Sequence, residues 1–356
     1  MSKLKIAVIG IGIGGQIHIE RIKVSQDVEL TAIIAPNRDH NFQYASKERV
    51  PIFTTIEECA SKIKLDGIII ASPNQMHERQ AKICIELGIP ALLEKPITSN
   101  LIEGRKLCEL IEDRNAKILI GHHRAHNPIL KIARETIQAG RLGKLVSFMG
   151  SAQFHKPDHY FDTGPWRKIV GGGPIFINLI HEIDSLRRLV GEITQVQAIT
   201  SNSIRGFDVE DTAAINIVFE NGTLGTFILS DAASTAYSWE QTSNENRKYP
   251  NYLNLDCYMI SGTQGSLSIP TMHLRYVPKK TQASWWTPLE EEIIYVRNED
   301  PIKIQLNHFA DVIKGNCNPL VTARDGYRNL LITEAIKKSA EIKKIIIIDD
   351  FIMNHT

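Results

Sequence analysis

The sequence begins with a glycine turn that has the spacing of a dinucleotide-binding motif. Residues 10–15 read Gly-Ile-Gly-Ile-Gly-Gly and directly follow an apolar run at residues 5–9. In a strand–turn–helix setting, the first glycine permits a tight turn, the second removes a Cβ that would block a pyrophosphate, and the third lets the helix approach the strand. The helix N-terminus then offers unpaired amides to phosphate. We therefore expect a dinucleotide to be bound by Gly10, Gly12, Ile13, Gly14 and Gly15.

The residues after the second predicted strand indicate which dinucleotide binds. An acidic residue about 20 positions after the glycine turn would hydrogen-bond the ribose 2′-hydroxyl and repel a 2′-phosphate. Here the strand at residues 28–34 is followed by Ala-Pro-Asn-Arg at 35–38, without a carboxylate. Because Asn37 and Arg38 can contact a 2′-phosphate, the sequence favours NADP(H) over NAD(H). Asp39 would bind the ribose instead if this loop is longer than we assume.

Polar residues also follow the fourth and fifth predicted strands. Open α/β sheets bind ligands at the carboxyl ends of their strands. We therefore expect cofactor contacts from Ser72, Pro73, Asn74, His77, Glu94 and Lys95. Pro96 favours an extended conformation for Lys95, which would aim its ammonium into the crevice beside the nicotinamide and stabilise an alkoxide there. The alternative for Glu94 and Lys95 is a surface salt bridge.

The elements that must carry these residues alternate along the first third of the chain. Strand candidates lie at residues 5–9, 28–34, 51–53, 67–71, 91–94 and 117–120. Amphipathic segments between them complete the pattern of a parallel sheet with crossover helices. Thr55 with Glu58 three residues later forms a capping-box pattern, and Gly88 is an expected C-cap. We predict a doubly wound α/β nucleotide-binding domain over residues 1–125.

From about residue 127 the pattern changes to longer strand-like runs. Strands are expected at residues 145–153, 196–200, 213–219, 223–229, 255–261, 293–296 and 345–348. Helices are expected at residues 128–139, 176–190 and 327–342. Asn221-Gly222 predicts a hairpin turn. These features predict an α+β domain with a mainly antiparallel sheet over residues 126–356, and they leave open whether the C-terminal tail packs on the first domain.

The helix at residues 176–190 has a face suited to proton transfer. Leu179, Ile183 and Leu186 form an apolar stripe, while Asn178 and His181 lie one turn apart on an adjoining face. This pairing favours a polar cavity over a structural histidine in the core. Histidine titrates in the range that acid/base chemistry needs.

Other candidate substrate ligands come from two loops. Residues 155–167 are unusually polar and aromatic, and their last two residues, Trp166 and Arg167, suit a polyhydroxylated or anionic ligand. Arg124 would line the crevice or form an interdomain ion pair. The expected substrate-binding set is thus Arg124, Trp166, Arg167, Asn178 and His181. His122 and His123 lack carboxylate or cysteine ligands at suitable spacing, so no metal is expected.

Composition excludes several classes of protein. The 356 residues carry 41 Lys plus Arg against 40 Asp plus Glu, so no basic field indicates nucleic acid binding. The longest apolar runs are far shorter than the roughly 20 residues that span a bilayer. The five cysteines show no CxxC or Cys/His cluster, which argues against zinc and against a disulfide framework. A cytoplasmic protein is expected.

Taken together, these motifs resemble the Gfo/Idh/MocA oxidoreductase family over essentially the whole chain. The resemblance is carried by the Gly10–Gly15 turn, Ser72-Pro73-Asn74 with His77, Glu94-Lys95-Pro96, Gly121-His122-His123-Arg124 with Asn127-Pro128, and Gly171-Gly172-Gly173-Pro174 through His181 and Asp184. Glu-Lys-Pro at the fifth strand is its specific marker. The resemblance implies a Rossmann domain followed by a domain with a large, open, mainly antiparallel sheet. It also implies that copies of the chain associate through this sheet into a homo-oligomer, either a dimer or a tetramer.

The resemblance also implies an activity. It implies hydride transfer between nicotinamide and a carbinol carbon of a sugar, cyclitol or sugar-like acid, with substrate between the domains, Lys95 holding the reacting oxygen and His181 acting as acid/base. Many sugar and inositol dehydrogenases of the family carry an aspartate four residues before this histidine, where this chain has Ile177. That difference argues against simple transfer of the inositol substrate set. The alternatives are an NAD-retaining enzyme that cleaves glycosides or catalyses elimination, and a non-catalytic sugar or dinucleotide sensor.

Overall fold

The computed structural model describes residues 2–353, which form two compact units. The first unit comprises the chain up to His126 together with Pro301–Leu330, and the second comprises Asn127–Asp300 together with the residues from Leu331 onward. The expected boundary after residue 125 lies beside the observed one. Residues 301–330, which the sequence pattern assigned to the second domain, belong to the first unit. Among the described helices, none combines the length and apolarity that crossing a bilayer requires.

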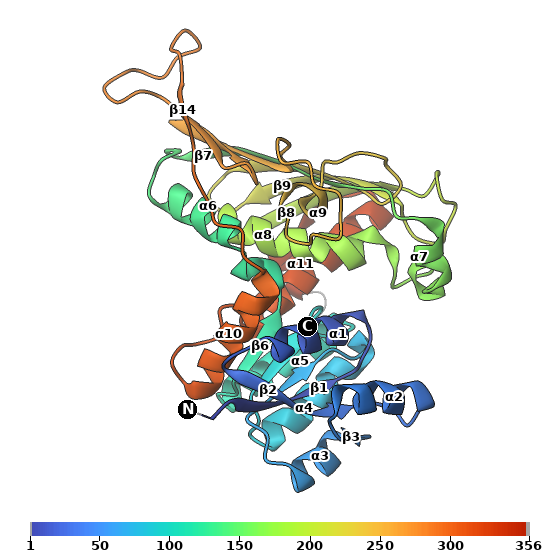
Figure 1. Ribbon diagram of the computed structural model, residues 1–356. Helices are drawn as coiled ribbons and strands as arrows, with labels where there is room; N and C mark the ends of the chain where they lie inside the picture. The colour runs from blue at the N-terminus through green and yellow to red at the C-terminus, as the bar shows by residue number, and fades with distance from the viewer. Residues whose placement is uncertain (1, 354–356) are drawn as a thin grey trace. The chain divides into compact units, whose positions relative to one another are not determined.

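The first unit contains a parallel sheet of six strands in the order β3-β2-β1-β4-β5-β6 (Figure 1). Its strands are β1 (Leu4–Ile9), β2 (Val28–Ile34), β3 (Ile52–Phe53), β4 (Gly67–Ile70), β5 (Ala91–Glu94) and β6 (Ile118–Gly121). The central strands are almost entirely apolar and buried, as expected for a parallel sheet covered on both faces. The predicted doubly wound fold is confirmed.

Helices connect these strands. They are α1 (Ile13–Lys23), α2 (Asp39–Glu48), α3 (Ile56–Lys62), η1 (Asn74–Met76), α4 (His77–Glu86), α5 (Leu101–Asp113) and η2 (His123–His126). The predicted cap of α3 forms, since Glu58 N donates to Thr55 Oγ1 at 3.1 Å. Gly88 follows α4 with φ of +66°, a conformation that favours glycine.

Helix α10 (Pro301–Lys314), which we did not predict, also belongs to this unit. Its buried face includes Leu306, Phe309 and Val312, and it packs against η2 and α1. The side chain of Phe309 lies so close to Gly67 that a Cβ on this glycine would come within 3.1 Å of it. This burial explains why the segment joins the first unit although it is remote in sequence.

The second unit contains a nine-stranded sheet in the order β14-β13-β12-β11-β7-β10-β9-β8-β15. Its strands are β7 (Leu145–Gln153), β8 (Ile193–Ser201), β9 (Thr212–Phe219), β10 (Leu224–Ser230), β11 (Tyr258–Gly262), β12 (Gly265–Ile269), β13 (His273–Tyr276), β14 (Glu290–Ile293) and β15 (Ile346–Ile347). Among the described strands of this second sheet, only the β7–β10 pair is parallel. The predicted large, mainly antiparallel sheet is confirmed.

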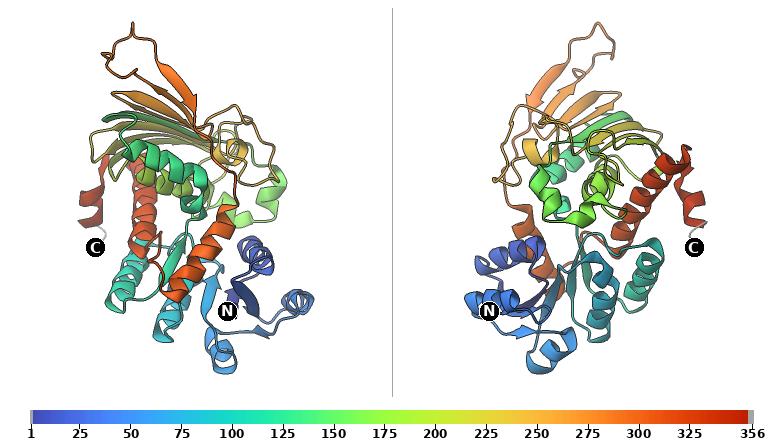
Figure 2. Two further views of the ribbon diagram at one scale, coloured as in Figure 1. Left: turned by 60° about the vertical axis from the view of Figure 1, so that its left-hand side comes forward. Right: turned by 90° about the vertical axis from the view of Figure 1, so that its right-hand side faces the viewer.

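Helices cover one face of this sheet and leave the other open (Figures 1 and 2). The helices of this unit are α6 (Pro128–Gln138), α7 (Asp158–Asp162), η3 (Pro165–Lys168), η4 (Ile175–Leu179), α8 (Ile180–Leu189), α9 (Trp239–Thr242) and α12 (Ile348–Met353). Helix α11 (Ala323–Ile342) begins in the first unit and continues into the second.

Two parts of the second unit differ from the sequence prediction. The strand expected at 293–296 was wrong, because it shares only Ile293 with β14, and β12 and β13 were not predicted. Their short runs are rich in glycine, serine and charged residues, which weakens the alternating apolar pattern. The strand expected at 345–348 is only β15, because Ile348 begins α12.

Candidate active site

The glycine turn has the geometry that a pyrophosphate requires. Gly10 has a φ of +82°, and a Cβ there would lie 2.7 Å from the carbonyl oxygen of Ala71. A Cβ at Gly15 would lie 1.9 Å from the carbonyl oxygen of Gly10, whereas a Cβ at Gly12 would meet no atom within 4 Å. Packing thus requires the first and third glycines, and the second leaves open space for a ligand.

Helix α1 begins at this open space. Gly12 is its N-cap, and no side chain among the described residues caps it. Ile13 and Gly14, the first two residues of the helix, are exposed. Amides of a first helical turn point away from the helix and attract anions. The turn therefore fits the pyrophosphate of a dinucleotide.

Asn37 and Arg38, the residues expected to meet the ribose, are exposed after β2. The loop is held by Asn41, whose Nδ2 donates to the carbonyl oxygen of Pro36 at 2.7 Å. Arg38 is the N-cap of α2, and Asp39 is the first residue of that helix. A basic and an acidic side chain thus stand next to each other at this position.

His77 links the two loops that follow β4 and β5. Its ring is buried, with Nδ1 2.7 Å from the carbonyl oxygen of Pro96 and Nε2 3.0 Å from that of Ser72. Burial lowers the pKa of His77, and the hydrogen bonds with the two carbonyl oxygens oppose part of this shift. Ser72 Oγ in turn donates to Gln80 Oε1 at 2.6 Å. These contacts connect the Ser72 segment to the Lys95 segment, where the Lys95–Pro96 peptide is cis.

Glu94 contacts a histidine that sequence reasoning missed. His18, buried on α1, lies with Nε2 2.8 Å from Glu94 Oε1, and the backbone N–H of Lys95 donates to Glu94 Oε2 at 3.3 Å. Burial alone would raise the pKa of Glu94, but the hydrogen bond from His18 and the charges of His18, His123 and Lys95 lower it to about 2. Glu94 is therefore an ionised carboxylate that joins α1 to the residues beside Lys95.

Arg124 lies on η2, directly after β6, and is buried. The neighbouring His122 is also buried, and its Nε2 lies 3.3 Å from Asn329 Nδ2 of α11. Among the described residues, no group of three or more His, Cys, Asp or Glu side chains is placed to hold a metal ion.

In the second unit, Asn178 and His181 lie on the helix that the sequence predicted. Its first turn, η4, is a π-helix, a feature frequently found at functional sites. The carbonyl oxygen of His181 accepts a hydrogen bond from Ser185 Oγ at 3.1 Å. Asp184 forms an ion pair with Arg188 at 2.9 Å within the same helix.

Glu210, which the sequence did not single out, holds the start of this helix. Its Oε1 accepts a hydrogen bond from the backbone N–H of Ile175 at 2.8 Å. Gly173 has a φ of +80°, and a Cβ there would lie 2.6 Å from the same oxygen. Burial raises the pKa of Glu210. The triple-glycine segment therefore allows this carboxyl to approach the first turn.

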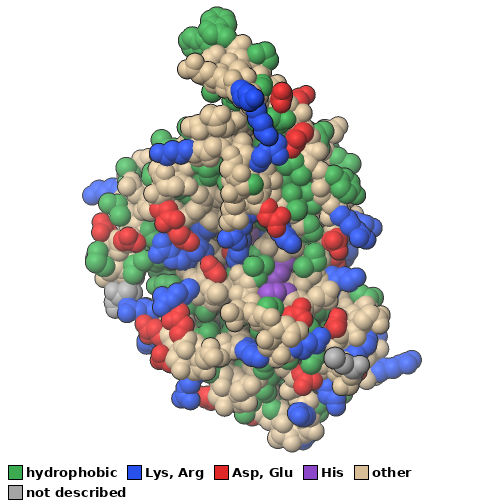
Figure 3. Space-filling model, turned by 90° about the vertical axis from the view of Figure 1, so that its left-hand side faces the viewer, with side chains coloured by type: hydrophobic (Ala, Val, Ile, Leu, Met, Phe, Trp, Pro, Cys, Tyr) green, Lys and Arg blue, Asp and Glu red, His purple; other side chains and the backbone are tan. Residues whose placement is uncertain are grey.

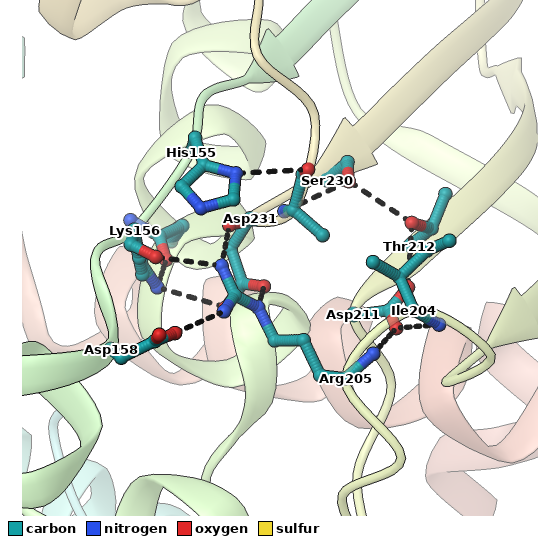
Figure 4. Close-up of polar contacts among 11 residues, drawn as sticks. His155, Lys156, Asp158, Ile204, Arg205, Asp211, Thr212, Ser230 and Asp231 are labelled. Carbon is teal, nitrogen blue, oxygen red and sulfur yellow. Dashed lines mark hydrogen bonds and ion pairs between the residues drawn. The ribbon is translucent and has the colours of Figure 1, made fainter.

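A second missed group surrounds Lys156, in the loop after β7. Lys156 Nζ donates to Asn178 Oδ1 at 2.7 Å and lies 3.5 Å from Asp231 Oδ2. Arg205 Nε donates to Asp231 Oδ1 at 2.8 Å (Figure 4). Sequence reasoning noted that residues 155–167 are polar, but nothing local distinguishes this lysine from a solvated one.

Trp166 and Arg167, the two substrate ligands predicted in the loop at residues 155–167, differ in their contacts. Trp166 is 52% exposed. The guanidinium of Arg167 instead folds onto its own loop, where it stacks 3.8 Å from the centre of the Tyr160 ring and donates to the carbonyl oxygen of Tyr160. A Cβ on Gly172 would lie 2.6 Å from the carbonyl oxygen of Arg167, so this loop contacts the triple-glycine segment.

Comparison with known proteins matches both units to one family. Residues 4–122 match the family model described as "Oxidoreductase family, NAD-binding Rossmann fold", and residues 130–268 match "GFO/IDH/MocA C-terminal domain". The rhizopine catabolism protein MocA of Rhizobium meliloti is 25% identical, with 94% of each chain covered. The myo-inositol 2-dehydrogenase of Thermotoga maritima is 23% identical, and the match covers 98% of this chain and 100% of that protein. The fold is also that of the WlbA dehydrogenase from Bordetella pertussis, solved with NADH and UDP-GlcNAcA (TM-score 0.76, 20% identity, 97% of this chain and 99% of that one).

Proposed function

Because this chain belongs to the Gfo/Idh/MocA family of NAD-binding oxidoreductases, we propose that it is an NAD(P)-dependent dehydrogenase or reductase acting on a carbinol carbon of a sugar, cyclitol or sugar-like acid. The observation that carries the proposal is the glycine turn, whose open second glycine and exposed helix N-terminus fit a dinucleotide. The names of the relatives, a myo-inositol dehydrogenase among them, support the substrate class.

The chemistry divides between the cofactor and two side chains. A bound nicotinamide dinucleotide supplies hydride transfer. When a carbinol is oxidised, its hydroxyl must also lose a proton, and we assign His181, in its neutral form, to accept it. We assign Lys95 to hold the same oxygen and stabilise the negative charge that develops on it. Reduction of the carbonyl would use the same groups in reverse, with the proton returning from His181.

A screen of polyols, aldoses and sugar acids with both dinucleotides, followed by two variants, tests this proposal. We expect Lys95→Met and His181→Asn to lower kcat/KM by about 10²-fold or more. NADPH or NADH binding, measured by fluorescence titration, should change by less than about threefold, since the glycine turn is untouched. If both variants keep normal turnover, the roles assigned to Lys95 and His181 are wrong.

The proposal extends to cofactor preference. The exposed Arg38 and Asn37 support NADP(H) over NAD(H), because a guanidinium pairs well with a 2′-phosphate. The Asp39 side chain beside them is the group that would favour NAD(H). The relative solved with NADH shows that its own chain binds the non-phosphorylated cofactor.

We also propose that a second copy of the chain covers the open sheet face. A hollow of about 580 Å³ on this face is lined by residues that include the exposed Met149, Leu224 and Met259. Beyond β13, the hairpin arm at residues 277–289 carries Trp285 and Trp286, which are 90% and 83% exposed. Figure 3 shows hydrophobic side chains at the tip of this arm. Exposed apolar surface of this kind is typical of an interface.

The cytoplasmic location that we expect from the sequence stays a prediction.

A further inference from the structure

The contact between Lys156 and Asn178 connects a buried ammonium to the helix that carries His181. Lys156 is 7% exposed, and its Nζ donates to Asn178 Oδ1 at 2.7 Å. Asn178 precedes His181 by three residues, in the π-helical turn η4. Both partners lie in the second unit, and nothing in the reaction assigned above uses Lys156.

The position of this ammonium is set by a buried ion-pair network. Asp231, 2% exposed, lies 3.5 Å from Lys156 Nζ through Oδ2 and accepts from Arg205 Nε through Oδ1. Arg205 Nη2 also donates to the carbonyl oxygen of Lys156 at 2.8 Å. Asp211, also buried, accepts from the backbone N–H groups of Ile204 and Arg205 at 2.9 Å each.

These contacts hold both the backbone and the side chain of Lys156. Figure 4 shows Arg205 lying among Lys156, Asp158 and Asp231. The ring of Tyr160 lies 5.0 Å from the ammonium and adds a cation–π contact. Burial lowers the pKa of Lys156, while the charges of Asp231 and Glu240 raise it. The network therefore anchors one cation at a defined point beside Asn178.

The chemistry of the two groups determines how the Asn178 amide is turned. An ammonium has three donors and no acceptor, so only the carbonyl oxygen of the amide can face Lys156. The NH₂ group of Asn178 must then point away from Lys156. The hydrogen bond of the Asn178 side chain to the described residues is the one that its Oδ1 accepts from Lys156, and Asn178 is half-buried. A carboxylate at this position would present an acceptor oxygen on the side away from Lys156, whereas the Asn178 amide presents its NH₂ group there as a donor.

We propose that Lys156 is a positioning and specificity-determining residue, which presents the Asn178 NH₂ as a hydrogen-bond donor to a lone pair on a substrate oxygen. The substrates favoured carry an accepting oxygen, as a hydroxyl, carbonyl or carboxylate does, at the carbon next to the reacting one. This inference rests on the proposed function, in which His181 acts on the substrate. Lys156 itself acts through Asn178.

The arrangement of the pair can be tested without any substrate. In ¹⁵N-labelled protein, the hydrogen-bonded ammonium of Lys156 should give a slowly exchanging ¹⁵Nζ signal that is absent from Lys156→Met and shifted in Asn178→Leu. The signal should be unchanged in Lys338→Met, which removes an exposed lysine of the same unit. A Lys156 signal that does not respond to Asn178→Leu would overturn the proposal, whether or not the enzyme's substrate is known.

The donor role is tested with analogues of the substrate that the screen identifies. If Asn178 donates, an analogue with fluorine in place of the neighbouring hydroxyl, which accepts but cannot donate, should keep a kcat/KM about tenfold above that of the deoxy analogue. In Lys156→Met and in Asn178→Asp this advantage should fall to less than about twofold, chiefly through KM. Asn178→Asp keeps a partner for Lys156, so it separates the donor role from folding. If the ratio of kcat/KM for the fluoro analogue to that for the deoxy analogue is the same in the wild type, Lys156→Met and Asn178→Asp, the donor role is disproved. The proposed function would still stand in that case, provided that the Lys95 and His181 variants lose activity.

Discussion

The Nε2 atom of His18 lies 2.8 Å from the Oε1 atom of Glu94, although 76 residues separate the two in sequence. This contact joins helix α1, which starts at the glycine turn, to the end of the strand that precedes Lys95. Helix α1, which would hold the pyrophosphate, is therefore linked by one hydrogen bond to the end of β5, which precedes the lysine proposed to hold the reacting oxygen.

The His18–Glu94 contact predicts a pH-dependent contribution to stability. Glu94→Gln should lower the free energy of unfolding by about 1–3 kcal/mol at pH 7, because it weakens a charge-assisted hydrogen bond. The folded-state pKa of Glu94, about 2, lies below its ordinary value. The stabilisation is therefore complete above that ordinary value and is lost as the pH falls toward 2. Urea unfolding of both proteins at pH 7 and pH 3 measures the difference, and a gap that widens at pH 3 would contradict this account.

The glycine turn predicts opposite behaviour for two similar substitutions. Gly12→Ala should leave the melting temperature nearly unchanged, since its Cβ meets no atom within 4 Å, yet weaken dinucleotide binding by about tenfold or more. Gly15→Ala should destabilise the protein itself, because its Cβ would lie 1.9 Å from the carbonyl oxygen of Gly10. Calorimetry with and without dinucleotide separates the two effects. A stable Gly15→Ala protein with normal binding would show that the turn is looser than described.

Arg38 predicts a change in cofactor preference. Arg38→Ala should weaken NADPH binding by about tenfold while NADH binding changes little, because only the former carries the 2′-phosphate that the guanidinium would pair with. Asp39→Asn serves as the matched control and should favour NADPH further. Titration with both dinucleotides measures the ratio. If Arg38→Ala weakens both equally, this arginine does not discriminate between them.

The exposed tryptophans predict an interface. Trp285→Ser with Trp286→Ser should shift the protein to a smaller species in sedimentation velocity, because apolar burial across the interface is lost. Wild-type tryptophan fluorescence should also move to longer wavelength on dilution, as the arm becomes solvated. Tyr295→Ser, at another exposed aromatic residue outside the arm, is the control. An unchanged sedimentation coefficient in the double variant would exclude the arm from the interface.

Local sequence patterns were sufficient for most elements of the fold. The predicted bounds of β2, β5 and β7 agree with the structure, since each is a continuous or alternating apolar run. Helix α10 was not predicted, although Leu306, Phe309 and Val312 lie at helical spacing on its buried face. The hairpin of β13 and β14 was missed because its residues are largely polar and only Leu274 is buried, so no alternating apolar pattern marks it.

Candidate ligands were harder to separate from residues that support them. His77 was expected at the cofactor, and the structure shows both of its ring nitrogens at backbone carbonyl oxygens. Arg167 was expected at the substrate, and its guanidinium stacks on Tyr160. Residue type alone reports the chemistry that a side chain can perform, not the partner that it meets.

The local amino-acid sequence determines the glycine turn, the parallel sheet and the polar residues at the strand ends. These features depend on backbone dihedral preferences and on the spacing of apolar residues a few positions apart. The pairings of His18 with Glu94, Glu210 with Ile175, and Lys156 with Asn178 depend on tertiary structure alone. Each partner comes from a different element, and the strength of each contact depends on the burial that packing creates. Such burial is a property of the folded chain as a whole, which no segment of the sequence reports.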